Sequence, residues 1–127
     1  MKILKEETRS TKQGPADWFS GMVWLDPVVA GEMPSRLKAT RVSFGPGART
    51  AWHTHPRGQA LHVLSGVCHV QLRGEPVQEI TSGDSVWIEA GEVHWHGAAP
   101  ERTMVHLAMQ ETDDNGVDVV WLEHVSE

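Results

Sequence analysis

The chain has 127 residues and a formal net charge of −6, from 11 basic and 17 acidic side chains. This length predicts a single domain, residues 1–127. The sequence has no cluster of Lys and Arg and no apolar run near the ~18 residues of a membrane span, so we expect neither nucleic acid nor a membrane as partner. The N-terminus is charged and has no signal-peptide core, and the single cysteine, Cys68, is interpreted as a packing residue. These features predict a cytoplasmic protein.

Short segments typical of β-strands, separated by turn residues, follow one another along the chain. Residues 1–8 are expected to form a first strand, and residues 18–25 a second that ends at Asp26-Pro27 before a loop over residues 28–36. Residues 37–44 alternate as a strand does, and a tight turn is expected at Ser65-Gly66. The other expected strands are 59–64, 67–73, 77–80, 85–88, 93–97, 102–110 and 117–123. Since no stretch longer than about ten residues has a helical period, we predict an all-β sandwich or barrel with a ligand site in its mouth.

Two glycine-bounded segments rich in histidine are candidates for a metal site. His53 and His55 are two residues apart, so in an extended segment their imidazoles point to the same side. Gly58 lets the chain bend before Gln59, which opens the next strand and can add an amide oxygen. A fourth ligand must come from elsewhere, and His94 in the second segment can supply it. We therefore predict that His53, His55, Gln59 and His94 bind one ion; the alternative is a pair of solvated loop histidines.

The spacing of these residues resembles the two motifs of the cupin superfamily. Residues 47–66 contain Gly, five residues, His-Thr-His, three residues, Gln, six residues and Gly, and residues 83–94 contain Gly, seven residues, Gly, two residues and His. Gln59 stands where most cupins carry Glu, and Glu89 and Ala98 replace the usual Pro and Asn of the second motif. The resemblance implies a single-domain cupin jelly-roll β-barrel.

Longer stretches resemble a narrower group, the bacterial manganese-dependent hydroxynitrile lyases of the cupin type. The stretches are GPADWF (14–19), PGARTAWHTHP (46–56), GDSVW (83–87), GEVHWHGAAP (91–100), HLAMQE (106–111) and WLEHV (121–125). Members of the group cleave cyanohydrins such as mandelonitrile into an aldehyde and hydrogen cyanide. The resemblance implies manganese at the four ligands named above, with His106 as an acid–base group and Thr40, Val42 and Gln110 in the substrate pocket.

The neutral ligand set has a chemical consequence. Three imidazoles and an amide leave a divalent ion its full double positive charge, which favours anionic ligands and suits the release of cyanide. We expect His106 to exchange the proton, Gln110 to orient it or the substrate, and Phe44 and Leu61 to join Val42 in holding an aromatic ring. Ligand type leaves Fe, Ni and Zn open beside Mn. A metal-dependent dioxygenase and a cupin that binds a small molecule without catalysis remain the alternative functions.

The remaining histidines and three of the six tryptophans are assigned from their place in the strand pattern. His96 lies two residues past His94, so it is expected on the metal face as a catalytic residue, supporting the ligands or lining the pocket, whereas His62 is expected to face outward. The other two histidines, His69 and His124, are interpreted as structural. Trp52, Trp87 and Trp95 fall near the histidine segments and are interpreted as filling the barrel or a subunit contact rather than as walls of a substrate pocket. Because strands at both chain ends would leave unpaired sheet edges, we expect a homodimer or homotetramer.

Overall fold

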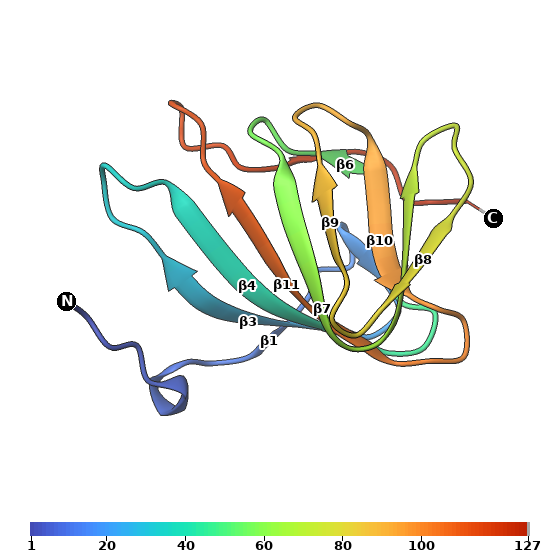
Figure 1. The fold of residues 1–127 in the computed structure, drawn as a ribbon, viewed down its shortest axis with the longest axis horizontal. Coiled ribbons are helices and arrows are strands. Elements are labelled where there is room, and N and C mark those ends of the chain that lie inside the picture. Colours follow the sequence, from blue (N-terminus) through green and yellow to red (C-terminus); the bar gives the residue numbers. More distant parts are fainter. Residues whose placement is uncertain (127) are drawn as a thin grey trace.

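The computed structural model describes residues 1–126, in which β-strands joined by short turns follow one another along the chain (Figure 1). The elements are η1 (Glu6–Thr8), a 3₁₀ turn, and the strands β1 (Lys12–Gln13), β2 (Phe19–Ser20), β3 (Val23–Ala30), β4 (Leu37–Phe44), β5 (Arg49–Thr50), β6 (His53–Thr54), β7 (Gln59–Leu72), β8 (Gln78–Thr81), β9 (Ser85–Ile88), β10 (His94–Ala98), β11 (Met104–Glu111) and β12 (Val120–Trp121). The predicted all-β fold is confirmed. The limits of β4 and β9 agree with those expected from sequence.

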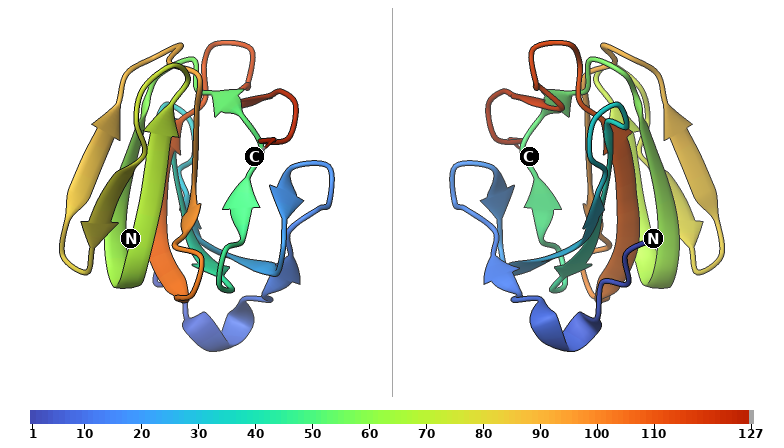
Figure 2. Two further views of the ribbon diagram at one scale, coloured as in Figure 1. Left: turned by 90° about the vertical axis from the view of Figure 1, so that its right-hand side faces the viewer. Right: turned by 90° about the vertical axis from the view of Figure 1, so that its left-hand side faces the viewer.

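All of these strands belong to one curled, antiparallel sheet. The main order is β1-β3-β4-β11-β7-β10-β5-β2, with β8 and β9 also on β7, and β6 joining β10 to β12. Figure 2 shows how the sheet bends back so that its two ends face each other. The bend follows β7, whose first half pairs with β11 and whose second half pairs with β10. This curl brings side chains of β4, β6, β10 and β11 into one interior.

A bend within one long strand replaces the tight turn expected at Ser65-Gly66. β7 continues through both residues, and the pairing of β11 with β7 shifts its register between Val105 and His106. Gly66 has a φ of 83°, and a Cβ there would lie 1.9 Å from the carbonyl oxygen of Thr103. Only glycine lets the two backbones approach this closely. The glycine therefore marks a bend shared by two parts of the sheet.

The N-terminal predictions need correction. Residues 1–8 form no strand; they end in η1, and the first strand is β1. The segment 18–25 divides at Gly21 into β2 and β3, which pair with different neighbours. β3 also continues past Asp26-Pro27 to Ala30, with a register shift beside the proline. Since β1 pairs with β3 only at Trp24 and Leu25, Pro27 lies on an open edge and its missing N–H costs no ladder bond.

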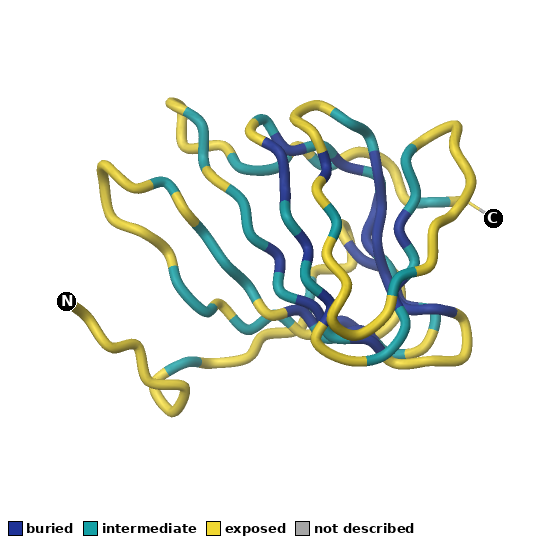
Figure 3. The backbone as a smooth tube through the Cα atoms, viewed as in Figure 1, coloured by how far each residue is buried: buried dark blue, intermediate teal, exposed yellow. Residues whose placement is uncertain are grey.

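The interior is filled by the inward side of each strand, as the alternation predicted. β10 is buried along its whole length and lies between β7 and the short β5 and β6 (Figure 3). The largest buried apolar side chains include Val23, Phe44, Leu61, Val63 and Met104.

The exposed apolar side chains include Trp24, Leu64 and Trp87. No helix within residues 1–126 is long and apolar enough to cross a membrane. The homo-oligomer stays a prediction.

Candidate metal centre

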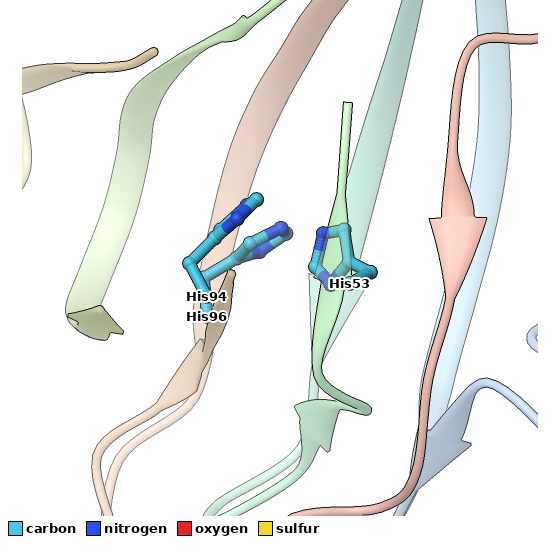
Figure 4. A group of neighbouring side chains, drawn as sticks. All are labelled: His53, His94 and His96. Atoms are coloured by element: carbon cyan, nitrogen blue, oxygen red, sulfur yellow. The ribbon is translucent and has the colours of Figure 1, made fainter. Parts of the chain in front are cut away.

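Three buried histidines point toward one another from β6 and β10. His53 is the register partner of His94 in the pairing of these strands, and His96 follows two residues later on the same side of β10. One ring nitrogen of each lies within 4.8 Å of those of the other two. Figure 4 shows the rings of His94 and His96 beside each other, facing His53. The three imidazoles can therefore contribute to a single metal site.

The other two predicted ligands join this cluster. The His55 ring lies with its centroid 5.0 Å from that of His53 and 5.4 Å from that of His94. The Oε1 atom of Gln59 is 3.3 Å from Nε2 of His94. His55 and Gln59 therefore lie beside the three histidines, although His55 is not one of the residues whose ring nitrogens lie within 4.8 Å of one another.

Hydrogen bonds fix which nitrogen of each predicted ligand is free. Nδ1 of His53, His55 and His94 lies 2.9, 2.7 and 3.0 Å from the carbonyl oxygens of Ala51, Asp118 and Glu92, respectively. A carbonyl oxygen only accepts, so in each ring Nδ1 must donate the proton and Nε2 keeps its lone pair. Nε2 of His55 is buried without a hydrogen-bond partner among the described residues. This arrangement is typical of histidines that bind a metal through Nε2.

The closest pair in the cluster shows that a cation fits. Nε2 of His94 is an acceptor by the preceding argument, and Oε1 of Gln59 is an acceptor by its chemistry. Two lone pairs only 3.3 Å apart and buried repel each other unless a positive charge lies beside them. The donor set, imidazole nitrogen with one amide oxygen, is suitable for a divalent transition metal. The identity of the metal stays a prediction.

Burial keeps the whole cluster uncharged near neutral pH. Removal from water lowers the pKa of His94 from 6.5 to about 4, and for His53 burial and then the neighbouring His94 and His55 lower it well below 6.5. Burial also lowers the pKa of His55. Since a metal needs the neutral imidazole, the site is prepared for binding without prior loss of protons.

The ligand cluster borders a cavity of about 260 Å³. Its wall is formed by Trp18, Phe19, Leu25, Lys38, Thr40, Val42, Thr50, His53, His55, Gln59, His96, Ala108, Gln110, Asp118, Val119 and Trp121. Seven of these side chains are apolar or aromatic, three of them being Trp18, Phe19 and Trp121, and the other nine are polar or charged. A pocket of this kind suits a small organic molecule held with a polar group toward the metal centre.

Comparisons with known proteins agree with this architecture. Residues 40–109 match the family model described as Cupin domain. The chain belongs to the cupin family. It is 49% identical to a protein named (R)-mandelonitrile lyase from Granulicella tundricola, over all of this chain and 96% of that one. A cupin-like protein from Thermotoga maritima is 38% identical, with a TM-score of 0.84 over 100% of this chain and 92% of that one. The polyketide cyclase RemF from Streptomyces resistomycificus, 20% identical with a TM-score of 0.75 over 97% and 87% of the two chains, shares the fold.

Within this cupin, His106 does not reach the cavity wall itself. It is fully buried on β11, and its Nε2 atom lies 2.9 Å from Nδ1 of His96, which does line the cavity. Its ring packs against Phe44, with centroids 5.2 Å apart, and burial lowers the pKa of His106 to about 4. Nε2 of His96 and Nδ1 of His106 are buried without partners within residues 1–126. The two rings thus form a connected pair between core and cavity.

The predicted pocket residues divide by their place along the strands. Thr40, Val42 and Gln110 line the cavity as expected. Phe44 and Leu61 belong instead to the hydrophobic core, where their exposed fractions are 2% and 0%. They share the inward side of their strands with the pocket residues but lie one step deeper. Alternation gives the side that a residue faces, not its depth.

The sequence interpretation did not identify Trp18, Trp121 and Asp118 as residues of the cavity wall. Trp18 and Trp121 stack with ring centroids 5.2 Å apart and both line the cavity. Trp52 and Trp95 instead have arginine guanidinium groups over their rings, those of Arg73 and Arg49, which agrees with the expected packing role. The inward alternation of β4 was a usable signal for Lys38. Trp121 reaches the cavity from β12, where it is the register partner of His53, and Asp118 reaches it from the irregular segment between β11 and β12; residue spacing marks neither as a cavity residue.

Proposed function

We propose that this cupin is a metal-dependent hydroxynitrile lyase, which cleaves and forms cyanohydrins such as mandelonitrile. The observation that carries the proposal is the direct contact between an aromatic-walled cavity and a cluster of neutral, lone-pair-bearing ligands. The relative named (R)-mandelonitrile lyase, 49% identical over the whole chain, supports the same chemistry. Cyanohydrin cleavage converts a neutral hydroxyl and a carbon–carbon bond into a carbonyl group and cyanide, so it needs positive charge and a proton acceptor together.

His53, His55, Gln59 and His94 would hold the metal, and His96 would lie beside it with its Nε2 lone pair free. We expect Mn²⁺, with Fe, Ni and Zn as alternatives. A divalent ion among uncharged ligands supplies an electrophile for the oxygen and cyanide that become negative during cleavage. Gln59 matters because a carboxylate at the same place would cancel part of that charge.

The histidine pair behind the cavity wall would move the proton. His96 presents an unpartnered Nε2 at the wall and can take the hydroxyl proton as the carbon–carbon bond breaks. Its Nδ1 contact with His106 lets the second ring share the charge, and the proton then returns to cyanide. Burial lowers the pKa of both His96 and His106, so both rings are neutral near pH 7 and each has one nitrogen lone pair. Trp18, Trp121 and Val42 would hold the ring of the substrate.

An anaerobic assay on metal-loaded protein tests this function. The parent protein should release benzaldehyde from mandelonitrile without oxygen and should carry about one metal ion per chain. His106→Ala should keep the metal and slow turnover by ~10²-fold or more, in the range that general acid–base catalysis contributes. His69→Ala is the matched control, because the partly exposed His69 does not line the cavity and pairs with Glu79 at 3.0 Å.

The same samples separate the other functions. Oxygen consumption with a bound substrate, and no benzaldehyde without oxygen, would replace the lyase by a dioxygenase. Tight binding of a small molecule with no turnover under either condition would indicate a binding protein. Equal turnover in His106→Ala and the parent would remove the proton-transfer role from the histidine pair.

A further inference from the structure

A chain of side-chain hydrogen bonds connects the surface to the metal centre. Lys38 Nζ donates to Oδ2 of Asp118 at 3.2 Å, and Nε2 of Gln110 donates to the same oxygen at 3.0 Å. Nε2 of Gln59 donates to Oε1 of Gln110 at 3.2 Å. All four residues line the cavity. The chain ends at Gln59, whose other amide atom faces the ligand histidines.

The chain has a fixed direction because it begins at a carboxylate. An ionised Asp only accepts hydrogen bonds, so it can face only the NH₂ group of Gln110. The oxygen of Gln110 is then turned toward Gln59, and it in turn can face only the NH₂ group of Gln59. Oε1 of Gln59 is left toward Nε2 of His94, at 3.3 Å. Reversing any link would place an NH₂ group, which cannot bind a cation, inside the cluster.

We infer that Asp118 is the positioning residue of the metal centre: acting through Gln110, it holds the amide of Gln59 with its oxygen toward the ion. The inference rests on the proposed function only in taking Gln59 as a metal ligand. It explains why a neutral amide can replace a carboxylate here. A carboxylate presents an oxygen whichever way it turns, whereas an amide presents the right atom in only one of its two orientations.

Asp118 also orients a second ligand. Its backbone carbonyl accepts the Nδ1–H of His55 at 2.7 Å, which leaves Nε2 of that ring toward the cluster. The segment between β11 and β12 that carries Asp118 is attached to the barrel, since Arg36 donates to the Asp113 carbonyl at 2.6 Å. Lys38 balances the carboxylate charge, so Asp118 is kept in place without adding a net charge. One residue of this segment therefore sets the free atoms of two ligands.

Asp118→Asn removes the direction of the chain while changing few atoms. An Asn can offer either its oxygen or its NH₂ group to Gln110, so both orientations of Gln59 become accessible. Competition with a chromogenic chelator should show Mn²⁺ and Zn²⁺ bound 10- to 100-fold more weakly, the usual effect of removing an outer partner of a ligand. Asp114→Asn on the same segment is the control for lost charge and should leave the affinity within about threefold.

The same substitution in a Gln59→Glu variant distinguishes an effect on the orientation of the Gln59 amide from an effect on the fold. In Gln59→Glu the ligand has no wrong orientation, so adding Asp118→Asn should change metal affinity no more than Asp114→Asn does. Gln110→Leu removes the middle residue of the hydrogen-bond chain. It should weaken metal binding when residue 59 is the parental Gln and change it little in the Gln59→Glu background. This second variant keeps the test valid if Asp118→Asn does not fold.

Two outcomes would overturn the inference. One is unchanged affinity in Asp118→Asn, and the other is the same loss in both backgrounds, which would mean that Asp118 acts only on the fold. A parent that binds neither Mn²⁺ nor Zn²⁺ would also contradict it. Cyanohydrin cleavage is not measured here, so a parent that binds metal but lacks lyase activity would refute the proposed function and leave the positioning role intact.

Discussion

The interior of the barrel has two parts that are built from the same strands. The apolar part contains Val23, Phe44, Leu61, Val63 and Met104, and the ligand part contains His53, His55, Gln59, His94 and His96. β7 passes from one part to the other within five residues, from Val63 through Leu61 to Gln59, all facing inward. The backbone conformation is therefore the same in both parts. The side chain alone determines whether an inward position contributes to core packing or to the ligand cluster.

Burial acts on the two parts in opposite ways. Burying apolar side chains stabilises the folded state by about 25 cal/mol for each Å² of apolar surface removed from water. The histidines lose hydration, and this loss lowers their pKa values and keeps them neutral. The comparison predicts that damage to the apolar part weakens the fold, while damage to the ligand part weakens metal binding first.

The largest effect is expected from His94→Ala. This change removes a ligand from the centre of the cluster, so metal affinity should fall by more than the ~100-fold typical of an outer partner, and turnover should be lost. The measurement is metal content and affinity beside a thermal melt of the metal-free protein. His69→Ala should leave both unchanged. If His94→Ala retains the parental affinity, then the ion is held elsewhere.

The matching change in the apolar part is Leu61→Ala. It should lower the free energy of unfolding by about 2–5 kcal/mol, because it removes buried methyl groups and leaves a cavity. Denaturant unfolding of the metal-free protein gives this value. Leu64→Ala is the control on the same strand, since Leu64 is 39% exposed, and it should cost far less. Equal costs for the two leucines would show that Leu61 is not part of a packed core.

Acid should separate the two parts without mutation. His94 and His106 have pKa values of about 4 in the folded protein but near 6.5 when unfolded, so the unfolded chain binds protons first as the pH falls. The stabilisation is complete above about pH 6.5 and is lost as the pH falls to about 4, by at most about 3 kcal/mol for each ring. Chemical denaturation of metal-free protein from pH 7.5 to 4.5 measures this slope. A stability that stays flat over this range would mean that the rings are solvated.

Gln59→Glu tests the role of the neutral amide in the cluster. A carboxylate should hold a divalent ion more tightly, since at an effective dielectric of ~20 a unit charge ~4 Å away contributes ~4 kcal/mol before screening. The same charge should slow cyanohydrin cleavage by ~10²-fold, or ~2.7 kcal/mol, because negative charge develops at that place. Metal content and anaerobic turnover on one preparation decide between the two effects. If Gln59→Glu keeps its metal and turns over at the parental rate, the neutral charge of Gln59 has no role in cleavage.

The sequence predicted those features that depend on local pattern. The two-residue period placed His53 and His55 together, and the glycine-bounded segments brought His94 to them. Depth was not predictable in this way, which is why Phe44 was assigned to the pocket. Asp118 was missed because its role comes from a turn that crosses to the barrel mouth after β11, a long-range contact that no residue spacing records.

The smallest effect is expected for chemical labelling of Cys68, because burial acts on its pKa by the same physical rule as on the histidines. Burial favours the uncharged form of any group, so it lowers the pKa of the histidines and raises that of the Cys68 thiol to about 12. Cys68 is also fully shielded within the core, at 0% exposure. Because the thiolate is the reactive form, a disulfide reagent at pH 8 should label the folded protein only as fast as the protein opens, while the denatured chain reacts at once. Leu61→Ala should speed the labelling by destabilising the fold, and His94→Ala should change it far less. Rapid labelling of the parent would show that the apolar part admits water and that the contrast between the two parts is smaller than the packing indicates.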